Sequence, residues 1–512
     1  MLRRVCWLSL FFSLVTCAQT ALPLTPFELS DGAVLPKSQE VSAYLKQLTQ
    51  LSSQASMVQL GRSAGGRPVE ALLMSEEAAF LREGKPAAHK PTLMLIGSQH
   101  GNEPSGTEAV QIMVRQVLGG ELAHLLKKMN IVAIVLANPD GRDMNRRLNA
   151  KDENPNVDFI ATAASETRIY IDALQRFQPD VVYDLHETGR VKYPLTHKEG
   201  YLTTVNAQFE VGDNPNIDAG LRDYADNTFL PTLLKQVSQA GIPAARYDGE
   251  IITLSQSVTR GAMNLSNFRN YASLMGSLTV VAESLLDQPG NYPTPDNIKE
   301  RVRRQFVALE KFLALVEGDA AKIRQLSRHA RQLWRTQDNA QIALEFGFAP
   351  NPQQPQIKVP LIEKKSGQRA LKTFPYTDQI VVTERESLPV GYVIRAEQSR
   401  YKALLQRHHI QYREITQPEK ARLEQQRVSA LTVSEVQRPG VRDWLDVGIQ
   451  EKELETELKP GDLVVSTHQP LGRLAAIILD PRSDNTIYQE DEWRGLLLHN
   501  PLPVAVLISG EK

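Results

Sequence analysis

Two residues of the segment HGNEP have the types and the spacing of metal ligands. His100 and Glu103 stand three positions apart, directly after the apolar stretch TLMLIG. On a turn that enters a helix, this spacing lets both side chains face one point. An imidazole nitrogen and a carboxylate oxygen suit zinc, and a second histidine completes a catalytic site that keeps one position for water. His186, at the end of another apolar stretch, is the candidate third ligand. We therefore predict one Zn²⁺ ion held by His100, Glu103 and His186, against the alternative that His100 is a strand-end histidine bonded to a loop carbonyl.

Two carboxylates accompany these candidate ligands. Glu283 ends a further apolar stretch. Beside a zinc-bound water it would act as the general base, whereas otherwise it would face solvent or pair with an arginine. Asp184 precedes His186 by two positions and so shares its face of a strand, where it could orient the imidazole. It could equally cap a helix or form a salt bridge.

Four apolar stretches of strand length deliver polar residues at their ends. They cover residues 92–97, 131–137, 181–185 and 278–282. Helical patterns lie around and between them at 41–51, 105–118 and 165–177, and residues 57–75 read as two strands joined by a glycine-rich turn. Continuous apolar strands that alternate with helices predict an α/β domain with a largely parallel or mixed sheet. In such sheets the functional crevice lies at the carboxyl ends of the strands, so the polar residues should meet there.

The chain divides into a larger and a smaller domain. We predict a catalytic domain over residues 40–335 that ends in long helices from Asn297 onward. Residues 336–374 contain FAPNPQQPQ and are predicted to be a linker. Residues 375–512 are predicted to form a smaller C-terminal α+β or β-rich domain, with strands near 379–383, 391–395, 410–415, 462–467 and 504–508, a helix at 397–407 and a later polar helical region.

Composition excludes several classes of protein. The chain has 512 residues, of which 42% are hydrophobic and 23% charged, as in ordinary globular proteins. Its 58 Lys and Arg nearly balance its 59 Asp and Glu, so no overall field attracts nucleic acid or an anionic membrane. The only cysteines are Cys6 and Cys17, which excludes a disulfide scaffold and a thiolate zinc site.

The first 18 residues have the pattern of a signal peptide. Arg3 and Arg4 precede an apolar core, and small residues around Ala18 suit cleavage. We therefore expect a secreted or periplasmic protein. The alternative is a lipid anchor at Cys17. No segment reaches the roughly 18 apolar residues of a transmembrane span.

The order of these motifs resembles the zinc carboxypeptidases related to carboxypeptidase A. The matching motifs are HGNEP, NPDG, DLHE and Glu283, each at the end of a strand, over residues 44–286. The resemblance implies an α/β/α sandwich with a mixed, mostly parallel eight-stranded sheet, zinc on His100, Glu103 and His186, and Glu283 as general base. It also implies a peptide substrate, and the tail from Pro389 resembles the C-terminal extensions of exported bacterial members, some of which act on cell-wall peptides.

The family's arginines are harder to place. One of them polarises the scissile carbonyl, and others hold the substrate carboxylate. In the preferred alignment Arg147 is the polarising residue and Asn156 binds substrate, but Val157 stands where the carboxylate-binding arginine belongs. In the other alignment, 143–146 supplies the Asn-Arg pair and the polarising arginine has no clear place. Arg269 and Tyr271 precede the Glu283 strand and are further candidates for substrate binding, although no tyrosine stands at the family's distance.

The sequence thus predicts an exported zinc metallocarboxypeptidase that hydrolyses C-terminal peptide bonds. One alternative is a zinc amidase or deacylase that acts on cell-wall peptides or N-acyl substrates, because Val157 removes a carboxylate anchor. The other is an inactive peptide-binding pseudo-peptidase that keeps only the fold.

Overall fold

The structure is a computed structural model that describes residues 22–86, 89–189, 192, 194–286, 297–336, 340–434 and 444–510. The predicted signal peptide and the candidate lipid anchor at Cys17 lie outside the described residues. No helix within these ranges is both long enough and apolar enough to span a membrane.

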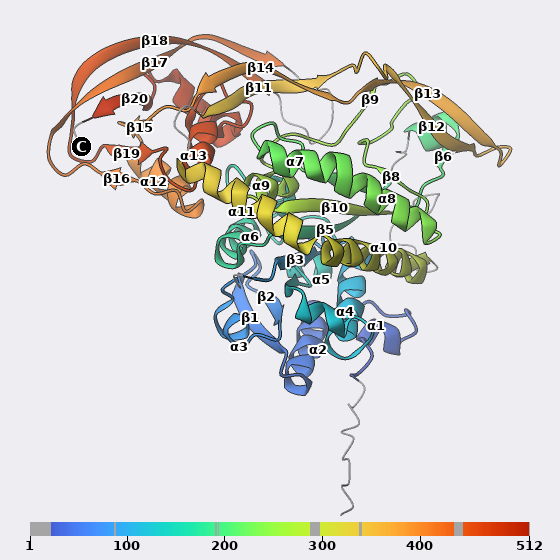
Figure 1. The fold of residues 1–512 in the computed structure, drawn as a ribbon. Coiled ribbons are helices and arrows are strands. Elements are labelled where there is room, and N and C mark those ends of the chain that lie inside the picture. Colours follow the sequence, from blue (N-terminus) through green and yellow to red (C-terminus); the bar gives the residue numbers. More distant parts are fainter. Residues whose placement is uncertain are drawn as a thin grey trace, which may run out of the picture.

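An eight-stranded mixed sheet forms the centre of the N-terminal half (Figure 1). Its strands, in spatial order, are β1 (Ala55–Arg62), β2 (Pro68–Met74), β4 (Asn130–Ile134), β3 (Thr92–Gly97), β5 (Val181–Thr188), β10 (Leu278–Leu285), β7 (Ala207–Val211) and β8 (Ala244–Arg246). The pairs β4/β3, β3/β5, β5/β10 and β7/β8 are parallel, and the other three pairs are antiparallel. The predicted α/β/α sandwich with a mixed eight-stranded sheet is confirmed.

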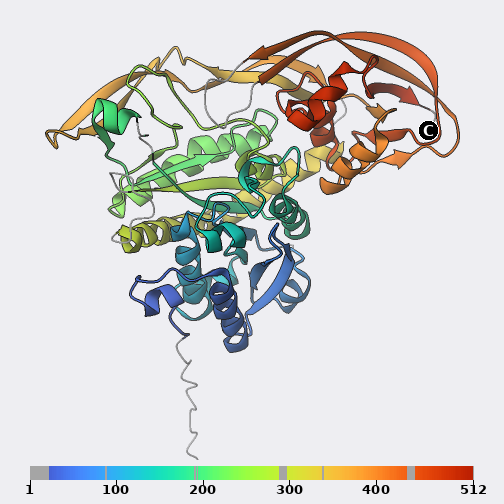
Figure 2. The same cartoon turned by 180° about the vertical axis from the view of Figure 1, so that it is seen from behind.

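Helices cover both faces of this sheet because its central strands are apolar on both sides. In β3, Leu93 and Leu95 join one buried cluster, while Met94 and Ile96 join the other. The first face carries α2 (Ser38–Leu51), α4 (Pro104–Gly119), α8 (Leu230–Gln239) and α10 (Ile298–Gly318), and the second carries α6 (Ser165–Phe177) and α9 (Phe268–Leu274). The remaining helices of this half are α1 (Pro26–Leu29), α3 (Ala78–Glu83), α5 (Pro139–Met144), α7 (Ala219–Tyr224) and α11 (Ala320–Thr336). Figure 2 shows the layers from behind.

The stretch 336–374, which we expected to be a linker, instead contains strands. The arm, residues 341–387, consists of β11 (Gln341–Ala349), β12 (Gln356–Glu363), β13 (Arg369–Thr377) and β14 (Gln379–Ser387). In it, β11 pairs with β14, and β12 pairs with β13. The proline- and glutamine-rich residues that suggested a linker are only the connection between β11 and β12. The composition of the segment predicted this turn correctly but did not indicate the strands on either side of it.

The far end of the arm joins the N-terminal half. There β12 pairs with β6 (Tyr201–Thr203) and β13 pairs with β9 (Val258–Thr259), which gives a four-stranded sheet in the order β6-β12-β13-β9. Both β6 and β9 belong to loops of the sandwich domain, which is the part of the chain built on the eight-stranded sheet. The four-stranded sheet therefore contains strands from two distant parts of the sequence. Figure 1 shows the arm crossing above the sandwich to reach them.

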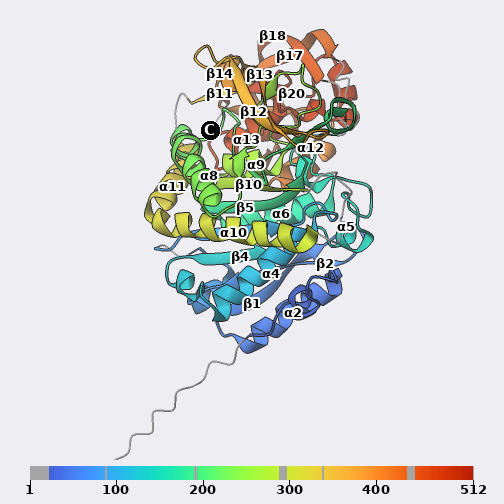
Figure 3. The same cartoon turned by 90° about the vertical axis from the view of Figure 1, so that its right-hand side faces the viewer.

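As predicted, the C-terminal part of the chain, from residue 391 on, forms a smaller β-rich domain, which is built on a six-stranded sheet. Its strand order is β16-β19-β15-β20-β17-β18. The elements are β15 (Gly391–Ile394), α12 (Gln398–Arg407), β16 (Arg413–Glu414), β17 (Glu419–Ser434), β18 (Trp444–Leu458), β19 (Leu463–Ser466), α13 (Gly472–Leu479), α14 (Asp491–Arg494) and β20 (Val504–Gly510). Figure 3 shows this domain above the sandwich.

The predicted polar helical region of this domain is wrong. It forms the two long antiparallel strands β17 and β18. Opposite charges face each other across them, as at Arg422 and Glu455. The buried residues Ala421 and Leu423 alternate with exposed ones, which is the period of a strand. Helix-forming residues are abundant here, but cross-strand pairs of charges and a buried face outweigh their local propensity.

Candidate active site

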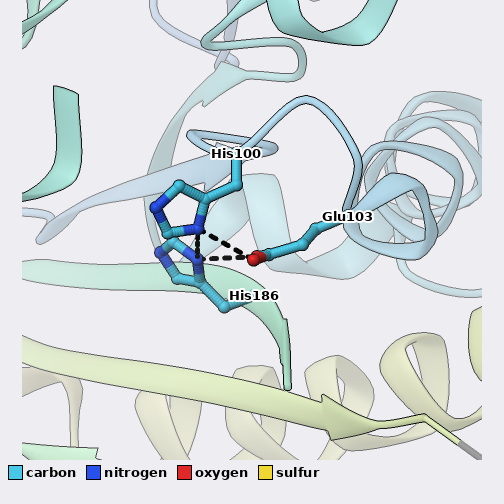
Figure 4. Close-up of side chains that lie close together, drawn as sticks. All are labelled: His100, Glu103 and His186. Atoms are coloured by element: carbon cyan, nitrogen blue, oxygen red, sulfur yellow. Dashed lines mark hydrogen bonds and ion pairs between the residues drawn. The ribbon is translucent and has the colours of Figure 1, made fainter. Parts of the chain in front are cut away.

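Three side chains from two elements meet around one point. His100 and Glu103 lie on the turn between β3 and α4, and His186 lies near the end of β5. The Nδ1 atom of His100 is 2.9 Å from Glu103 Oε1 and 3.1 Å from His186 Nδ1. The Nδ1 atom of His186 is 2.9 Å from Glu103 Oε2. Figure 4 shows the three side chains pointing toward one another.

These distances suit a tetrahedral zinc ion. Bonds of about 2.0–2.1 Å from zinc to nitrogen and oxygen place neighbouring ligand atoms about 3.3 Å apart, close to the separations observed. All three side chains are buried, and among the described residues they form the only cluster of this kind. The residues predicted as ligands therefore lie together, and their donor set fits zinc.

The turn that carries His100 depends on a glycine. A Cβ atom on Gly101 would lie 1.9 Å from the carbonyl carbon of Gly141, in the NPDG segment after β4. Only glycine permits this close approach of two backbones. The HGNEP and NPDG motifs are therefore packed against each other, which fixes the turn on which His100 and Glu103 stand.

Polar partners hold the outer nitrogen of each imidazole. His186 Nε2 lies 3.1 Å from Asp184 Oδ2, a contact through which Asp184 could orient the imidazole. Gln99 in turn donates a hydrogen bond of 2.8 Å to Asp184 Oδ1. His100 Nε2 lies 3.1 Å from Asn154 Oδ1. With the Nε2 atoms engaged, both rings present Nδ1 to the candidate metal position.

Sequence reasoning missed the partners Gln99 and Asn154. Gln99 directly precedes His100, and Asn154 precedes Asn156 by two positions. Their nearness to predicted site residues was a signal, but amide side chains are common in loops and nothing in the sequence distinguishes these two.

The electrostatics of the cluster favour a charged Glu103. Burial raises the pKa of the Glu103 carboxyl, but the charges and hydrogen bonds of His100 and His186 outweigh it and hold that pKa well below its usual range. Burial lowers the pKa of His100. Burial also lowers the pKa of His186, but Asp184 and Glu103 raise it more strongly, well above its usual value. A carboxylate anion and a neutral His100 are the forms that bind a cation.

Glu283 lies beside the cluster on the adjacent strand. It is paired in register with His186 across the parallel strands β5 and β10. Its Oε2 atom is buried and has no hydrogen-bond partner among the described residues. Burial raises the pKa of Glu283 to about 7, although His186 opposes this shift. A carboxylate in these surroundings is a good proton acceptor near neutral pH.

Arg147 also reaches the cluster. Its Nη1 donates a hydrogen bond of 2.9 Å to Glu103 Oε1, and half of its side chain is exposed. Asn156 belongs to the loop that carries Asn154, and its Oδ1 atom is buried without a hydrogen-bond partner among the described residues. Val157 follows and is exposed. Arg147 thus contacts a predicted ligand, and Asn156 and Val157 lie on the neighbouring loop; their roles in substrate binding stay predictions.

The other two predicted substrate-binding residues are engaged elsewhere. Arg269 is buried, donates to the carbonyl of Ala262 at 2.8 Å and lies 3.4 Å from Asp213 Oδ2. Tyr271 is fully buried, and its hydroxyl lies 3.0 Å from His408 Nδ1 in the C-terminal domain. Helix α9 directs Tyr271 into the contact between the domains. The position of Tyr271 in the sequence, shortly before the Glu283 strand, did not indicate that its side chain faces the C-terminal domain.

Comparison with known proteins shows that part of the chain matches a family model. Residues 41–159 match the family model described as "Zinc carboxypeptidase". This part of the chain is therefore similar to the zinc carboxypeptidases. The resemblance predicted from the motifs is therefore confirmed. The zinc carboxypeptidase match contains His100 and Glu103, whereas His186 and Glu283 lie beyond it.

Individual similar proteins are named carboxypeptidases. "Carboxypeptidase 2" from Trichophyton tonsurans is 30% identical over 241 residues, which are 46% of this chain and 43% of that protein. "Carboxypeptidase 2" from Trichophyton rubrum is 29% identical over 234 residues, covering 44% and 42%. The chain thus spans less than half the length of these curated relatives. A solved metallo-carboxypeptidase from Burkholderia cenocepacia is 19% identical, with a TM-score of 0.42 and coverage of 55% of this chain and 70% of that one.

Proposed function

We propose that this chain is a zinc metallocarboxypeptidase, a hydrolase that cleaves C-terminal peptide bonds. The observation that carries the proposal is the meeting of His100, Glu103 and His186 at ligand distances, with Glu283 in register on the neighbouring strand. The match of residues 41–159 to the zinc carboxypeptidases supports it.

The roles of the residues follow from their positions. His100, Glu103 and His186 would hold the zinc ion, which when bound makes a water molecule more acidic and polarises a carbonyl group. Glu283 accepts the proton of the attacking water at its carboxylate and returns it to the leaving amine. Arg147 is half exposed at the edge of the cluster, and its guanidinium donates hydrogen bonds to the oxyanion that develops on the substrate carbonyl.

Val157 favours a second candidate, an amidase or deacylase that cleaves cell-wall peptides or N-acyl substrates. Its exposed apolar side chain cannot pair with a carboxylate. Arg269, which we considered for substrate binding, is buried against Asp213 and Ala262 and so does not supply that anchor. A substrate without a free C-terminal carboxylate would not need the anchor that is missing.

A panel of matched peptides separates these functions. Each peptide is offered with a free C-terminal carboxylate and with a C-terminal amide, and the zinc content of the purified protein is measured in parallel. A carboxypeptidase releases the last residue from the peptides with a free carboxylate at least tenfold faster than from the amidated peptides. Equal cleavage of both forms supports the amidase, and a protein that binds zinc but cleaves neither form supports the peptide-binding pseudo-peptidase.

We further propose that the protein is exported. The signal-peptide pattern of residues 1–18 supports this, and Cys6 and Cys17, the only cysteines of the chain, both lie within it. Cell fractionation of a tagged full-length chain tests the proposal, because retention of the uncleaved chain in the cytoplasm would contradict it.

A further inference from the structure

Glu187, the residue after His186, forms an ion pair that the proposed chemistry does not use. Its Oε1 atom accepts a hydrogen bond of 2.7 Å from Arg301 Nε on helix α10. Both side chains are completely buried. Burying an ion pair carries a desolvation penalty, and apolar residues of similar volume often stabilise a protein as well or better. We therefore looked for a role of this pair in the adjacent candidate metal centre.

The other carboxylate oxygen of Glu187 contacts a different helix. Its Oε2 accepts a hydrogen bond of 3.0 Å from the backbone N–H of Ser105, in the first turn of α4. The carboxylate therefore bridges α10 and the N-terminal end of α4, which pack against each other (Figures 1 and 3). Glu103, a predicted zinc ligand, stands immediately before this helix.

The backbone around Glu187 is tied to the same centre. The N–H group of Glu187 donates a hydrogen bond of 3.0 Å to Glu103 Oε2. One turn after Arg301, the side chain of Gln305 donates a hydrogen bond of 2.8 Å to the carbonyl oxygen of His186. Gln305 of α10 therefore holds the carbonyl side of the peptide that links His186 to Glu187, and Glu103 holds its N–H side.

We propose that Glu187 and Arg301 are positioning residues that set the spacing between the two ligand-bearing segments. The pair fastens the end of β5, which carries His186, to the start of α4, which carries Glu103. Neither residue is a predicted ligand, and they act by holding the chain segments that carry the ligands. The inference rests on the proposed zinc site, and zinc affinity should depend on a contact made by a helix that supplies no ligand.

We call the Glu187–Arg301 ion pair the brace. Two variants test it without leaving a charge unpaired. Arg301→Lys keeps the charge but loses the planar fork that fits between Glu187 and Asn297. The double variant Glu187→Gln with Arg301→Met removes both charges together and so avoids an isolated buried ion. The matched control is Arg304→Met on the same helix, because Arg304 is also nearly buried and pairs with Glu300 of α10 itself.

The primary measurement is the zinc dissociation constant of the full chain, obtained by competition with a chelator. We expect both brace variants to bind zinc about 10- to 100-fold more weakly, and the control to match the parent. The absorption spectrum of the Co²⁺-substituted protein should also change in the brace variants, because it reports ligand geometry, which a loss of stability alone does not alter. The Tm of each metal-free protein shows that it is folded.

The outcomes distinguish the brace from the zinc site itself. Folded brace variants with the zinc affinity and Co²⁺ spectrum of the parent would overturn the positioning role. If Arg304→Met weakens zinc binding equally, the effect is a general one of α10 and the role is also rejected. A parent protein that binds no zinc would reject the metal centre proposed above, whatever the variants do.

Discussion

His186 and Glu283 are register partners on two adjacent parallel strands, β5 and β10. One is a predicted ligand and the other the proposed base, and strand pairing alone sets their separation. The relative position of this predicted ligand and the proposed base is therefore set by the sheet, whereas His100 and Glu103 are positioned by the turn after β3.

Replacing His186 tests the ligand assignment. His186→Ala removes one of the three ligands, so we expect zinc content to fall well below one ion per chain and peptide cleavage to fall to background. Metal analysis of purified protein measures the first effect. His124→Ala, at an exposed histidine on the surface, should leave both quantities unchanged. A zinc-replete, active His186→Ala protein would refute the assignment.

Replacing Glu283 separates metal binding from proton transfer. Glu283→Gln keeps the shape of the side chain but cannot accept the proton. We expect full zinc content and a fall in kcat of about 10²- to 10⁴-fold, the usual contribution of a general base. Stopped assays with the same peptide give kcat, and Glu317→Gln provides a control at a distant carboxylate. A near-normal kcat would remove Glu283 from the mechanism.

Val157→Arg tests the missing carboxylate anchor. A guanidinium at this exposed position could form a bidentate pair with a substrate carboxylate. For a carboxypeptidase we expect kcat/KM on free peptides to rise about tenfold relative to amidated peptides, with little change in stability. Val157→Gln controls for size and polarity. If the arginine variant gains nothing on free peptides, the substrate carboxylate does not reach this loop.

Because of His408, we expect the contact between the two domains to be sensitive to acid. It is fully buried between the Tyr271 hydroxyl, 3.0 Å from Nδ1, and the carbonyl of Ile160, 2.9 Å from Nε2. Burial lowers the pKa of His408 to about 4, although the hydrogen bond to Ile160 opposes this shift. In the unfolded chain a histidine has a pKa of about 6.5.

Between these two values the unfolded chain binds more protons than the folded one, so the contribution of His408 to stability falls as the pH drops from about 6.5 to about 4, by about 3 kcal/mol in total. His408→Gln keeps a donor for Ile160 but does not titrate. The urea midpoint of the parent should therefore fall more steeply between pH 7 and pH 5 than that of the variant. Parallel curves would show that His408 does not titrate in this range.

Much of the site could be predicted from the sequence because its residues stand at the ends of apolar strands. His100 and Glu103 follow such a strand, His186 and Glu283 lie near the ends of two others, and the topology of a mixed sheet brings those ends together. The predicted helix at 165–177 and the strand at 92–97 have the same bounds in the structure. A strong local pattern and the global fold agree at these positions.

Long-range contacts were outside the reach of this reasoning. Tyr271 was a candidate for substrate binding because it is near Glu283 in sequence, but its partner His408 is 137 positions away. The β17–β18 strands were expected to be helical because their charges favour helices locally, and only the pairing of one strand with the other reveals a sheet. The brace from Arg301 to Glu187 spans 114 positions and has no local signature.

The arm has a consequence for how the protein matures. Strands β6 and β9 lie in loops of the sandwich domain, yet their partners β12 and β13 are made more than a hundred residues later than β6. A nascent chain that has already produced the predicted metal ligands and Glu283 therefore still has an unfinished four-stranded sheet. The loops of the sandwich domain that carry β6 and β9 reach their final pairing only after synthesis has moved well into the second half of the chain.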